Sequence, residues 1–267
     1  MSDIKETIIT AIKILKRNEI DSAPLDAELL LSYVLKKSKE FLYTYPDYQL
    51  TKAQLKKFKQ LISRRIKYEP IAYLIGYKEF YGLKFIVNKH VLIPRPLSEQ
   101  IIDNALKIIE NKFLIRDTRY MICDIGTGSG CLIITLAKKL QEQKIINQFK
   151  LYATDISARA LKVAQKNAQL HQVKKHITFL KGDLLKPLIK ELALNAKGGR
   201  VDLIMANLPY LTKTDVKKES SIKKEPQKAL VGDFYSKLFK QIKRHRSRPI
   251  IIYEDKDGIS IKSNPYL

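Results

Sequence analysis

The chain has 267 residues, of which 45% are hydrophobic, and its 50 Lys and Arg against 27 Asp and Glu give a formal net charge of +23. This length predicts one α/β domain of ordinary size and a smaller accessory domain. No apolar run reaches the roughly 20 residues that a membrane-spanning helix needs. The N-terminus is amphipathic with early acids, unlike a secretory signal or transit peptide. We therefore expect a cytoplasmic protein that does not associate with membranes.

The positive charge has two open interpretations. Dense positive charge attracts polyanions, which favours contact with nucleic acid or the ribosome through a basic surface. The lysines are spread over every segment, however, as a drift in base composition would produce. The two cysteines, Cys123 and Cys131, both lie in segments that indicate burial, and no Cys/His spacing resembles a metal site. We expect neither a disulfide framework nor a bound metal.

The first seventy or so residues predict a small helical domain. Three segments have apolar residues at helical spacing, and no strand pattern lies between them. The second segment can be capped by Asp21 or Ser22, with Pro24 in its first turn, and the third by Thr51. The apolar positions are Ile4, Ile8, Ala11, Ile12 and Leu15, then Leu25, Leu29, Leu30 and Val34, then Leu55, Phe58, Leu61, Ile62 and Ile66. Such stripes bury one another, so we expect a domain over residues 1–75.

The pattern changes after Pro70. Residues 79–81 and 83–87 predict two short strands around a turn at Gly82, followed by an extended stretch to Pro96. We interpret residues 76–96 as a β-hairpin linker between two domains.

From Leu97 onward, strands and helices alternate. Expected strands cover residues 121–125, 151–154, 177–180, 201–205 and 250–253, and expected helices cover 97–110, 131–140, 158–170 and 234–243. Such alternation is typical of a parallel sheet with crossover helices. The fold class that we predict for residues 97–267 is therefore α/β.

A glycine-rich turn connects the first of these strands to its helix. It consists of Gly126, Thr127, Gly128, Ser129 and Gly130. Glycines let the backbone approach a ligand closely, and in a doubly wound sheet this turn lies at the carboxyl edge, where ligands bind. We predict a nucleotide-like cofactor here, although a dinucleotide site would match the spacing almost as well.

Two further strand ends carry candidate cofactor-binding residues. Asp155 can accept hydrogen bonds from both ribose hydroxyls of a cofactor, or it can be a helix N-cap, a role for which Ser157 competes. Asp183 and Leu184 follow the third strand, where a carboxylate and an apolar side chain could bind the edge and the face of an adenine. Acids are common in turns, so Asp183 alone is a weak signal.

The fourth strand ends in the segment that we predict to be catalytic, which consists of Asn207, Leu208, Pro209 and Tyr210. The side-chain oxygen of Asn207 and the backbone carbonyl of Leu208 can each accept one N–H of a substrate NH2 group, which orients that group for methyl transfer beside the cofactor. Pro209 keeps Leu208 extended, and Tyr210 offers a ring face to a planar group. Asn207 also borders the cofactor. The alternative interpretation is a simple strand-ending turn.

These three elements in order resemble the amino-methyltransferases of the class I fold. A more specific resemblance, to the HemK/PrmC family, extends over nearly the whole chain. It is carried by residues 69–76 (EPIAYLIG), 79–83 (EFYGL) and 92–99 (LIPRPLSE), by 25–31 (LDAELLL) upstream, and downstream by Glu225, Pro226, Ala229, Leu230 and residues 233–235 (DFY).

The resemblance implies a class I, Rossmann-like methyltransferase sheet with a small N-terminal helical domain that recognises the substrate. It implies S-adenosyl-L-methionine as the cofactor and N5-methylation of the glutamine in the Gly-Gly-Gln loop of a peptide chain release factor, by a monomeric enzyme without a metal. It places the cofactor loop on Gly126 to Gly130, the ribose carboxylate on Asp155, the adenine-side position on Leu184 and the substrate-amide motif on Asn207 to Tyr210.

The chain departs from the family pattern at three places. Leu208 stands where the family usually has proline, and Asn-Leu-Pro-Tyr is typical of rRNA adenine dimethyltransferases. Residues 213–228 are shortened and lysine-rich, so the loop over the active site is expected to differ. After Glu254 the family usually has two more strands, which we expect to be missing or divergent here, with an exposed sheet edge.

Two other functions stay open on the sequence alone. An rRNA or DNA adenine N6-methyltransferase would place a flipped base in the same pocket; Leu208 and the net charge favour it, and the linker and the helical domain argue against it. A catalytically silent module that binds S-adenosylmethionine or the ribosome is the other alternative. The intact glycine turn, Asp155 and Asn207 argue against this last function.

Overall fold

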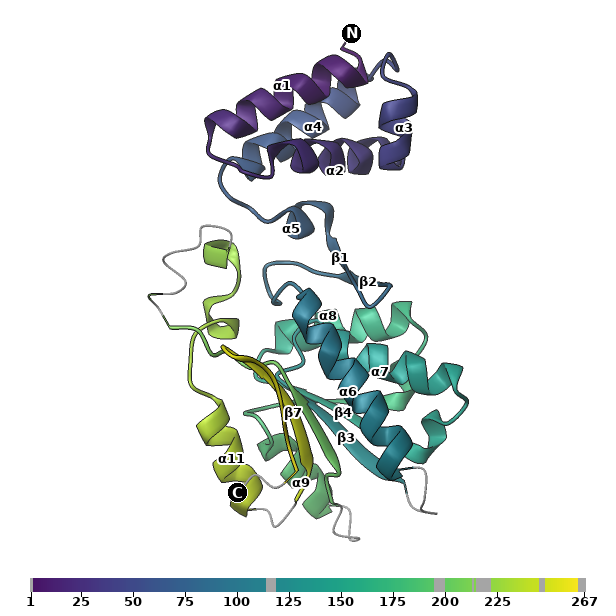
Figure 1. The fold of residues 1–267 in the computed structure, drawn as a ribbon, viewed down its shortest axis with the longest axis vertical. Coiled ribbons are helices and arrows are strands. Elements are labelled where there is room, and N and C mark those ends of the chain that lie inside the picture. The colour runs from purple at the N-terminus through teal and green to yellow at the C-terminus, as the bar shows by residue number, and fades with distance from the viewer. Residues whose placement is uncertain are drawn as a thin grey trace. The chain divides into compact units, whose positions relative to one another are not determined.

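The computed structural model describes residues 2–113, 119–194, 200–212, 214, 222–244 and 248–263 (Figure 1). The chain divides into two compact units, one formed by Met1–Gly76 with Glu219–Lys224 and the other by Tyr77–Lys218 with Glu225–Leu267. Across the described ranges, no helix combines the length and the apolar character needed to cross a bilayer. In the lysine-rich stretch, residues 213 and 215–221 lie outside the described residues. The expectation that this loop differs from the family pattern therefore also falls on residues outside the described ranges.

The first unit is helical, and its three expected helices are confirmed. Its elements are α1 (Ile4–Arg17), α2 (Ala23–Leu35), α3 (Lys39–Thr44), α4 (Lys52–Arg65) and α5 (Ile71–Ile75). α1 begins after Asp3, whose carboxylate accepts the backbone N–H of Glu6, and α4 begins with a capping box between Thr51 and Gln54. α3 and α5 were not predicted, because six and five residues are too few to display a helical period.

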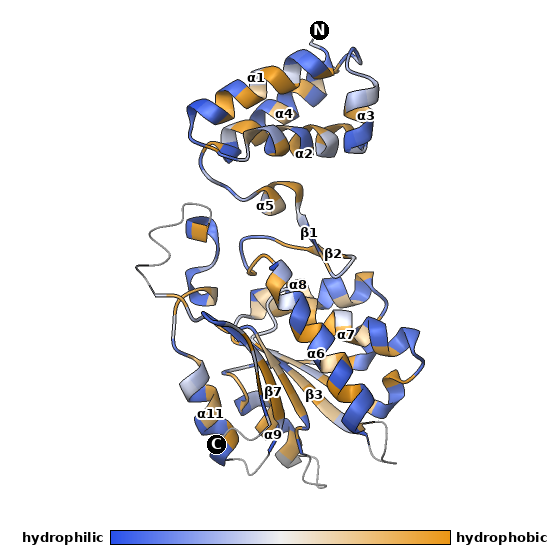
Figure 2. Cartoon of the chain, in the orientation of Figure 1, coloured by the Kyte–Doolittle hydropathy of each residue, from blue (hydrophilic) through white to orange (hydrophobic). Residues whose placement is uncertain are grey.

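The apolar faces of α1, α2 and α4 bury one another. Figure 2 shows the hydrophobic residues that recur along these helices in orange. One expected core position is wrong: Leu25 is 47% exposed. The adjacent Asp26 is buried in its place, and its carboxylate forms an ion pair with Arg65 of α4 at 2.7 Å. α2 is therefore rotated so that a charged pair, and not Leu25, lies between the helices.

The second unit starts with the expected hairpin. β1 (Tyr77–Phe80) pairs antiparallel with β2 (Leu83–Ile86) across a two-residue turn in which Tyr81 and Gly82 have φ of 52° and 71°. Two positive φ values in a two-residue turn match the right-handed twist of the strands. Phe80 and Phe85 are fully buried in the same cluster as the helices of this unit, so the hairpin packs on the sheet domain.

The predicted α/β sheet is confirmed. It has the order β5-β4-β3-β6-β7-β8, formed by β3 (Tyr120–Ile125), β4 (Phe149–Asp155), β5 (Ile177–Lys181), β6 (Leu203–Ala206), β7 (Ile250–Asp255) and β8 (Gly258–Lys262). All neighbours are parallel except β8, which pairs antiparallel with β7. We expected the strands after Glu254 to be missing or divergent, and among the described residues one strand, β8, follows Glu254 and forms the edge of the sheet. This strand is short and half-exposed, so its apolar alternation is weak.

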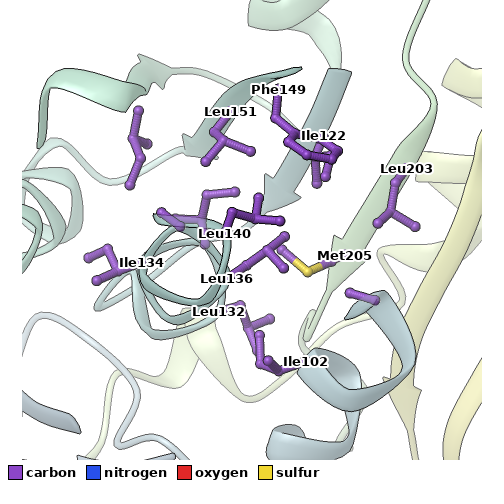
Figure 3. Packing of buried hydrophobic residues seen from close by; sticks show 14 of the residues in the cluster. Ile102, Ile122, Leu132, Ile134, Leu136, Leu140, Phe149, Leu151, Leu203 and Met205 are labelled. Carbon is purple, nitrogen blue, oxygen red and sulfur yellow. The ribbon is translucent and has the colours of Figure 1, made fainter. Parts of the chain in front are cut away.

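Helices cover both faces of the sheet (Figure 1). One face carries α6 (Glu99–Ile108), α7 (Cys131–Glu142) and α8 (Ala158–Leu170), and the other carries α9 (Lys186–Leu194) and α11 (Tyr235–Arg244). Alternate residues of β3 separate into the two cores, Ile122 into the first and Cys123 into the second. Figure 3 shows the first core, where Leu136 of α7 lies beside Met205 of β6 and Leu132 of α7 lies beside Ile102 of α6. α9 was not predicted. Of the two cysteines expected to be buried, Cys123 is buried and Cys131 is half-buried.

The strand order creates a switch point between β3 and β6. The chain leaves β3 toward β4 on one side, and it reaches β6 on the other side only later. Ile125 and Ala206, the last residues of these two parallel strands, are paired in register. The next residues, Gly126 and Asn207, therefore begin neighbouring loops at the crevice where open α/β sheets bind ligands.

Candidate active site

A cavity of about 460 Å³ opens beyond the carboxyl ends of β3, β4 and β6. All of the predicted site residues line it except Gly130 and Tyr210. Parts of two other segments, residues 89–95 and 226–229, complete its wall. Glu225 joins these segments, because its buried carboxylate accepts the backbone N–H of Ile93 at 3.0 Å and pairs with Arg95. One wall of the cavity therefore comes from the strand ends of the sheet, and the other comes from the two segments that Glu225 connects.

The glycine turn has the geometry of a ligand cradle. Gly126, Gly128 and Gly130 all have positive φ, of 72°, 54° and 83°. At Gly128 a side chain would meet only one backbone atom, at 3.9 Å, so this backbone faces open space. At Gly130 a Cβ would lie 2.6 Å from Ile134 Cδ1 and 3.1 Å from Ala164 Cβ, so Gly130 allows α7 to approach α8 and does not face the cavity.

Asp155 anchors this turn from β4. One of its oxygens accepts the backbone N–H of Gly128 at 2.9 Å, and the other accepts that of Ser157 at 2.8 Å. Burial raises the pKa of the Asp155 carboxyl. Ser157 is the N-cap of α8, since its hydroxyl accepts the N–H of Ala160. The competing interpretation of Asp155 as the N-cap is thus wrong, and each oxygen keeps a lone pair for a ligand hydroxyl.

Asp183 and Leu184 lie beside the cavity in different roles. Both carboxylate oxygens of Asp183 are ion-paired, one with Lys237 at 3.0 Å and one with Lys186 at 3.1 Å. Partial burial by itself raises the pKa of Asp183, but the hydrogen bonds and charges of these lysines outweigh it and hold the pKa below its ordinary value. Leu184 is buried with φ of 52°, and its carbonyl accepts the hydroxyl of Thr154. Leu184 thus supplies an apolar wall.

Two side chains hold the Asn207 carboxamide, and one of them, Ser98, also lines the cavity. Its side-chain nitrogen donates to Ser98 Oγ at 2.8 Å and to Glu254 Oε2 at 2.9 Å. With both amide hydrogens directed at these oxygens, the side-chain carbonyl oxygen is the atom free to accept a hydrogen bond from a ligand. Asn207 can therefore act as a fixed acceptor for an N–H group.

The other three residues of the predicted catalytic segment have distinct surroundings. Leu208 and Pro209 line the cavity, and the backbone N–H of Leu208 donates to the hydroxyl of Tyr235 at 3.0 Å. Tyr210 does not line the cavity, and its hydroxyl donates to Glu254 Oε1 at 3.0 Å. Burial and then the neighbouring carboxylate raise the pKa of Tyr210 to about 12, so this hydroxyl stays protonated at neutral pH.

The structure brings in four residues that the sequence patterns did not single out for the site. Asp124 is buried below the glycine turn; its Oδ2 accepts the hydroxyl of Thr127 at 2.6 Å, and its Oδ1 lacks a hydrogen-bond partner. Burial raises the pKa of Asp124 to about 7. Ile156, 66% exposed, lines the cavity beside Asp155. Ser98 and Glu254 approach Asn207 from far along the chain; acids at the ends of buried strands were the available signal for Asp124 and Glu254.

Comparisons with known proteins agree along the chain. The family model described as PrmC N-terminal domain matches residues 6–76, and the one described as methyltransferase domain matches residues 116–248. A release factor glutamine methyltransferase of Koribacter versatilis is 34% identical, over 91% of this chain and 82% of that protein. One of Dictyoglomus turgidum is 36% identical, over 90% of this chain and 81% of that protein.

Two further similarities are partial. A bifunctional methyltransferase of Rickettsia felis is 34% identical, over 86% of this chain but only 46% of that protein. Among solved structures, the catalytic domain of human METTL16 in complex with a MAT2A 3′UTR hairpin superposes with a TM-score of 0.50 at 16% identity, over 85% of this chain and 78% of that one. This likeness concerns the fold alone.

Proposed function

The chain belongs to the release factor glutamine methyltransferase family, and from this membership we propose that it methylates the side-chain nitrogen of the glutamine in the Gly-Gly-Gln loop of a peptide chain release factor. Members of this family are S-adenosylmethionine-dependent methyltransferases. We further propose that residues 1–75 recognise the release factor, that the enzyme is a monomer, and that it acts in the cytoplasm, where its substrate takes part in translation.

The residues around the glycine turn suit this cofactor. The open backbone at Gly128 leaves room for close approach, and the Asp155 oxygens can accept from the ribose hydroxyls. Leu184 and Ile156 offer apolar surface for the adenine. When bound, S-adenosylmethionine supplies an electrophilic methyl group on its sulfonium sulfur. The ion pairs of Asp183 make its carboxylate a weaker candidate for adenine binding than we expected from the sequence.

The observation that carries the proposal is the fixed carboxamide of Asn207 beside the glycine turn. Its oxygen can accept one N–H of the glutamine amide, and the Leu208 carbonyl can accept the other. Two acceptors fix the plane of a weakly nucleophilic nitrogen, and orientation of this kind supplies much of the rate in methyl transfer. We propose catalytic roles for Asn207, Leu208 and Pro209. Tyr210 stays part of the predicted catalytic segment, but its side chain does not line the cavity.

A second candidate is N6-methylation of an adenine in RNA or DNA. The basic side chains of Lys89, Arg159 and Lys228 line the cavity and favour contact with a nucleic-acid strand. The same surface could contact the ribosome without any methylation of RNA. The N-terminal unit of the PrmC type favours the release factor as the substrate.

One assay separates these functions. Labelled cofactor is offered with a release factor, with the Gln→Ala variant of its Gly-Gly-Gln loop, and with structured rRNA. Label on the wild-type release factor alone is expected. Label on rRNA would support the adenine methyltransferase, and no label on any substrate would leave a silent binding module.

The role of Asn207 has its own test. Asn207→Ala is expected to keep cofactor affinity within about threefold and to lose on the order of 100-fold or more in kcat, because the acceptor amide is no longer oriented. Asn111→Ala, an exposed asparagine at the opposite end of the sheet domain, is the matched control. Unchanged turnover in Asn207→Ala would refute the assigned role.

A further inference from the structure

Glu254 lies next to Asn207 because their strands are neighbours. Tyr253 of β7 pairs in register with Ala206 of β6, so the residues that follow, Glu254 and Asn207, are side by side at the carboxyl edge of the sheet. Glu254 is only 2% exposed. It therefore places a carboxylate within the protein, directly behind the segment that lines the cavity.

The partners of this carboxylate are unusual. Oε2 accepts from Asn207 Nδ2 at 2.9 Å and also from the hydroxyl of Ser98, and Oε1 accepts from the hydroxyl of Tyr210 at 3.0 Å. All three donors are neutral, and among the described residues Glu254 forms no ion pair with a lysine or arginine. A buried carboxylate without a cation costs stability. Its presence is explained if the acceptor atoms serve the reaction.

A carboxylate has a property that an amide or hydroxyl lacks at this position, since it can only accept hydrogen bonds. If the Asn207 side chain were flipped, its carbonyl oxygen would face Glu254 Oε2 and two acceptors would be buried against each other. Glu254 thus permits one orientation of the Asn207 amide. Its charge also polarises that amide through the shared hydrogen bond, which strengthens the carbonyl oxygen as an acceptor.

We propose that Glu254, assisted by Ser98, is the positioning residue of the methyl-transfer site. It orients the Asn207 carboxamide so that the oxygen, and not the nitrogen, meets the substrate, and it thereby makes the site selective for a methyl acceptor that donates an N–H. This proposal rests on the proposed function, and it adds a residue from β7 to a site that the sequence located on β3, β4, β5 and β6.

Two substitutions of similar length separate hydrogen bonding from packing. Glu254→Gln keeps an oxygen that can accept from Asn207 but no longer excludes the flipped amide, so kcat is expected to fall, by less than about tenfold. Glu254→Met fills the same space without such an acceptor, and kcat is expected to fall on the order of 100-fold with cofactor affinity nearly unchanged. Glu142→Met, at a 53% exposed carboxylate, is the control. Equal kcat in the Met and Gln variants would overturn the proposal.

A double-mutant cycle tests whether Glu254 acts through Asn207. In an Asn207→Ala background, Glu254→Met is expected to change kcat by less than about threefold, because the orientation that it fixes is already lost. A merely structural residue would give two independent, multiplying losses. Multiplying losses would contradict the positioning role.

A substrate-free measurement keeps this test separate from that of the proposed function. The side-chain NH2 resonances of Asn207, identified by their loss in Asn207→Ala, are expected to exchange slowly in the wild-type protein and in Glu254→Gln and at least tenfold faster in Glu254→Met. A wild-type chain that methylates no release factor would refute the proposed function, and the exchange rates would still decide the positioning role. Equal rates in all three proteins would refute it.

Discussion

The side chain of Leu208 fills the space beside Gly126, so that a Cβ atom on Gly126 would lie 2.7 Å from Leu208 Cδ2. The cofactor turn after β3 and the substrate segment after β6 are thus packed against each other. The family resemblance predicts proline at this position, and the backbone N–H of Leu208 donates to the hydroxyl of Tyr235. Proline has no such donor. The leucine at this position is therefore integrated into the site by both its side chain and its backbone.

Gly126→Ala is expected to damage the site through this contact. The left-handed backbone alone costs about 1 to 2 kcal/mol for a residue with a Cβ, and the clash with Leu208 adds displacement of the substrate segment. We expect cofactor affinity to fall more than tenfold, measured by calorimetry. Gly82→Ala isolates the backbone effect, because Gly82 has φ of 71° and open space around its Cβ position. Equal loss of affinity in both variants would contradict the packing argument.

Asp155→Ala is expected to weaken cofactor binding in two ways, through the backbone of Gly128 and through the hydroxyls of the ligand. The backbone N–H of Gly128 loses its acceptor, and the cavity loses the carboxylate proposed to bind the ribose. Cofactor affinity should fall by at least tenfold, which equilibrium dialysis with labelled cofactor can measure. Asp3→Ala is the control, because it also removes a carboxylate that accepts a backbone N–H, here at the N-cap of α1. It should cost about 1 kcal/mol of stability and leave cofactor affinity unchanged.

Tyr235→Phe is expected to destabilise the sheet domain. The hydroxyl of Tyr235 accepts the N–H of Leu208 and donates to the backbone carbonyl of Glu254, and all of these atoms are buried. Removing it leaves two buried backbone groups without a partner, at about 1 to 3 kcal/mol each. Urea denaturation measures the loss. Tyr43→Phe, which removes an exposed hydroxyl that bonds to Glu28, should change the free energy of unfolding by less than about 0.5 kcal/mol.

Asp124 should make stability fall as the pH rises. Burial raises its pKa from 3.8 to about 7 in the folded protein, so the folded state binds a proton more tightly than the unfolded state. Between these two values the unfolded state carries fewer protons, and the contribution of Asp124 to the free energy of unfolding therefore decreases with pH. Asp124→Asn, which does not titrate, should gain stability relative to the wild type between pH 4 and pH 8. A difference independent of pH would show that Asp124 is ionised throughout.

The elements with local signals could be predicted from the amino-acid sequence. Helical and strand periods located the three long N-terminal helices, the hairpin and the parallel strands, because burial of one face repeats over many residues. The glycine turn, Asp155 and the segment at Asn207 were also predicted, since each follows a buried strand and such ends meet at one edge of the sheet. Short elements such as α3, α5 and β8 have too few residues for a period, so they were missed.

Which side chains face one another could not be predicted from the sequence, because it depends on how the folded chain packs. Ser98 and Glu254 lie 109 and 47 residues from Asn207 along the chain, and they reach it because β7 lies beside β6 and the start of α6 packs close to their ends. Lys237 of α11 pairs with Asp183 in the same way, from 54 residues away along the chain. A residue type and its spacing fix the chemistry that a position can offer. The partner it meets depends on strand order and helix rotation, which arise from packing of the whole chain.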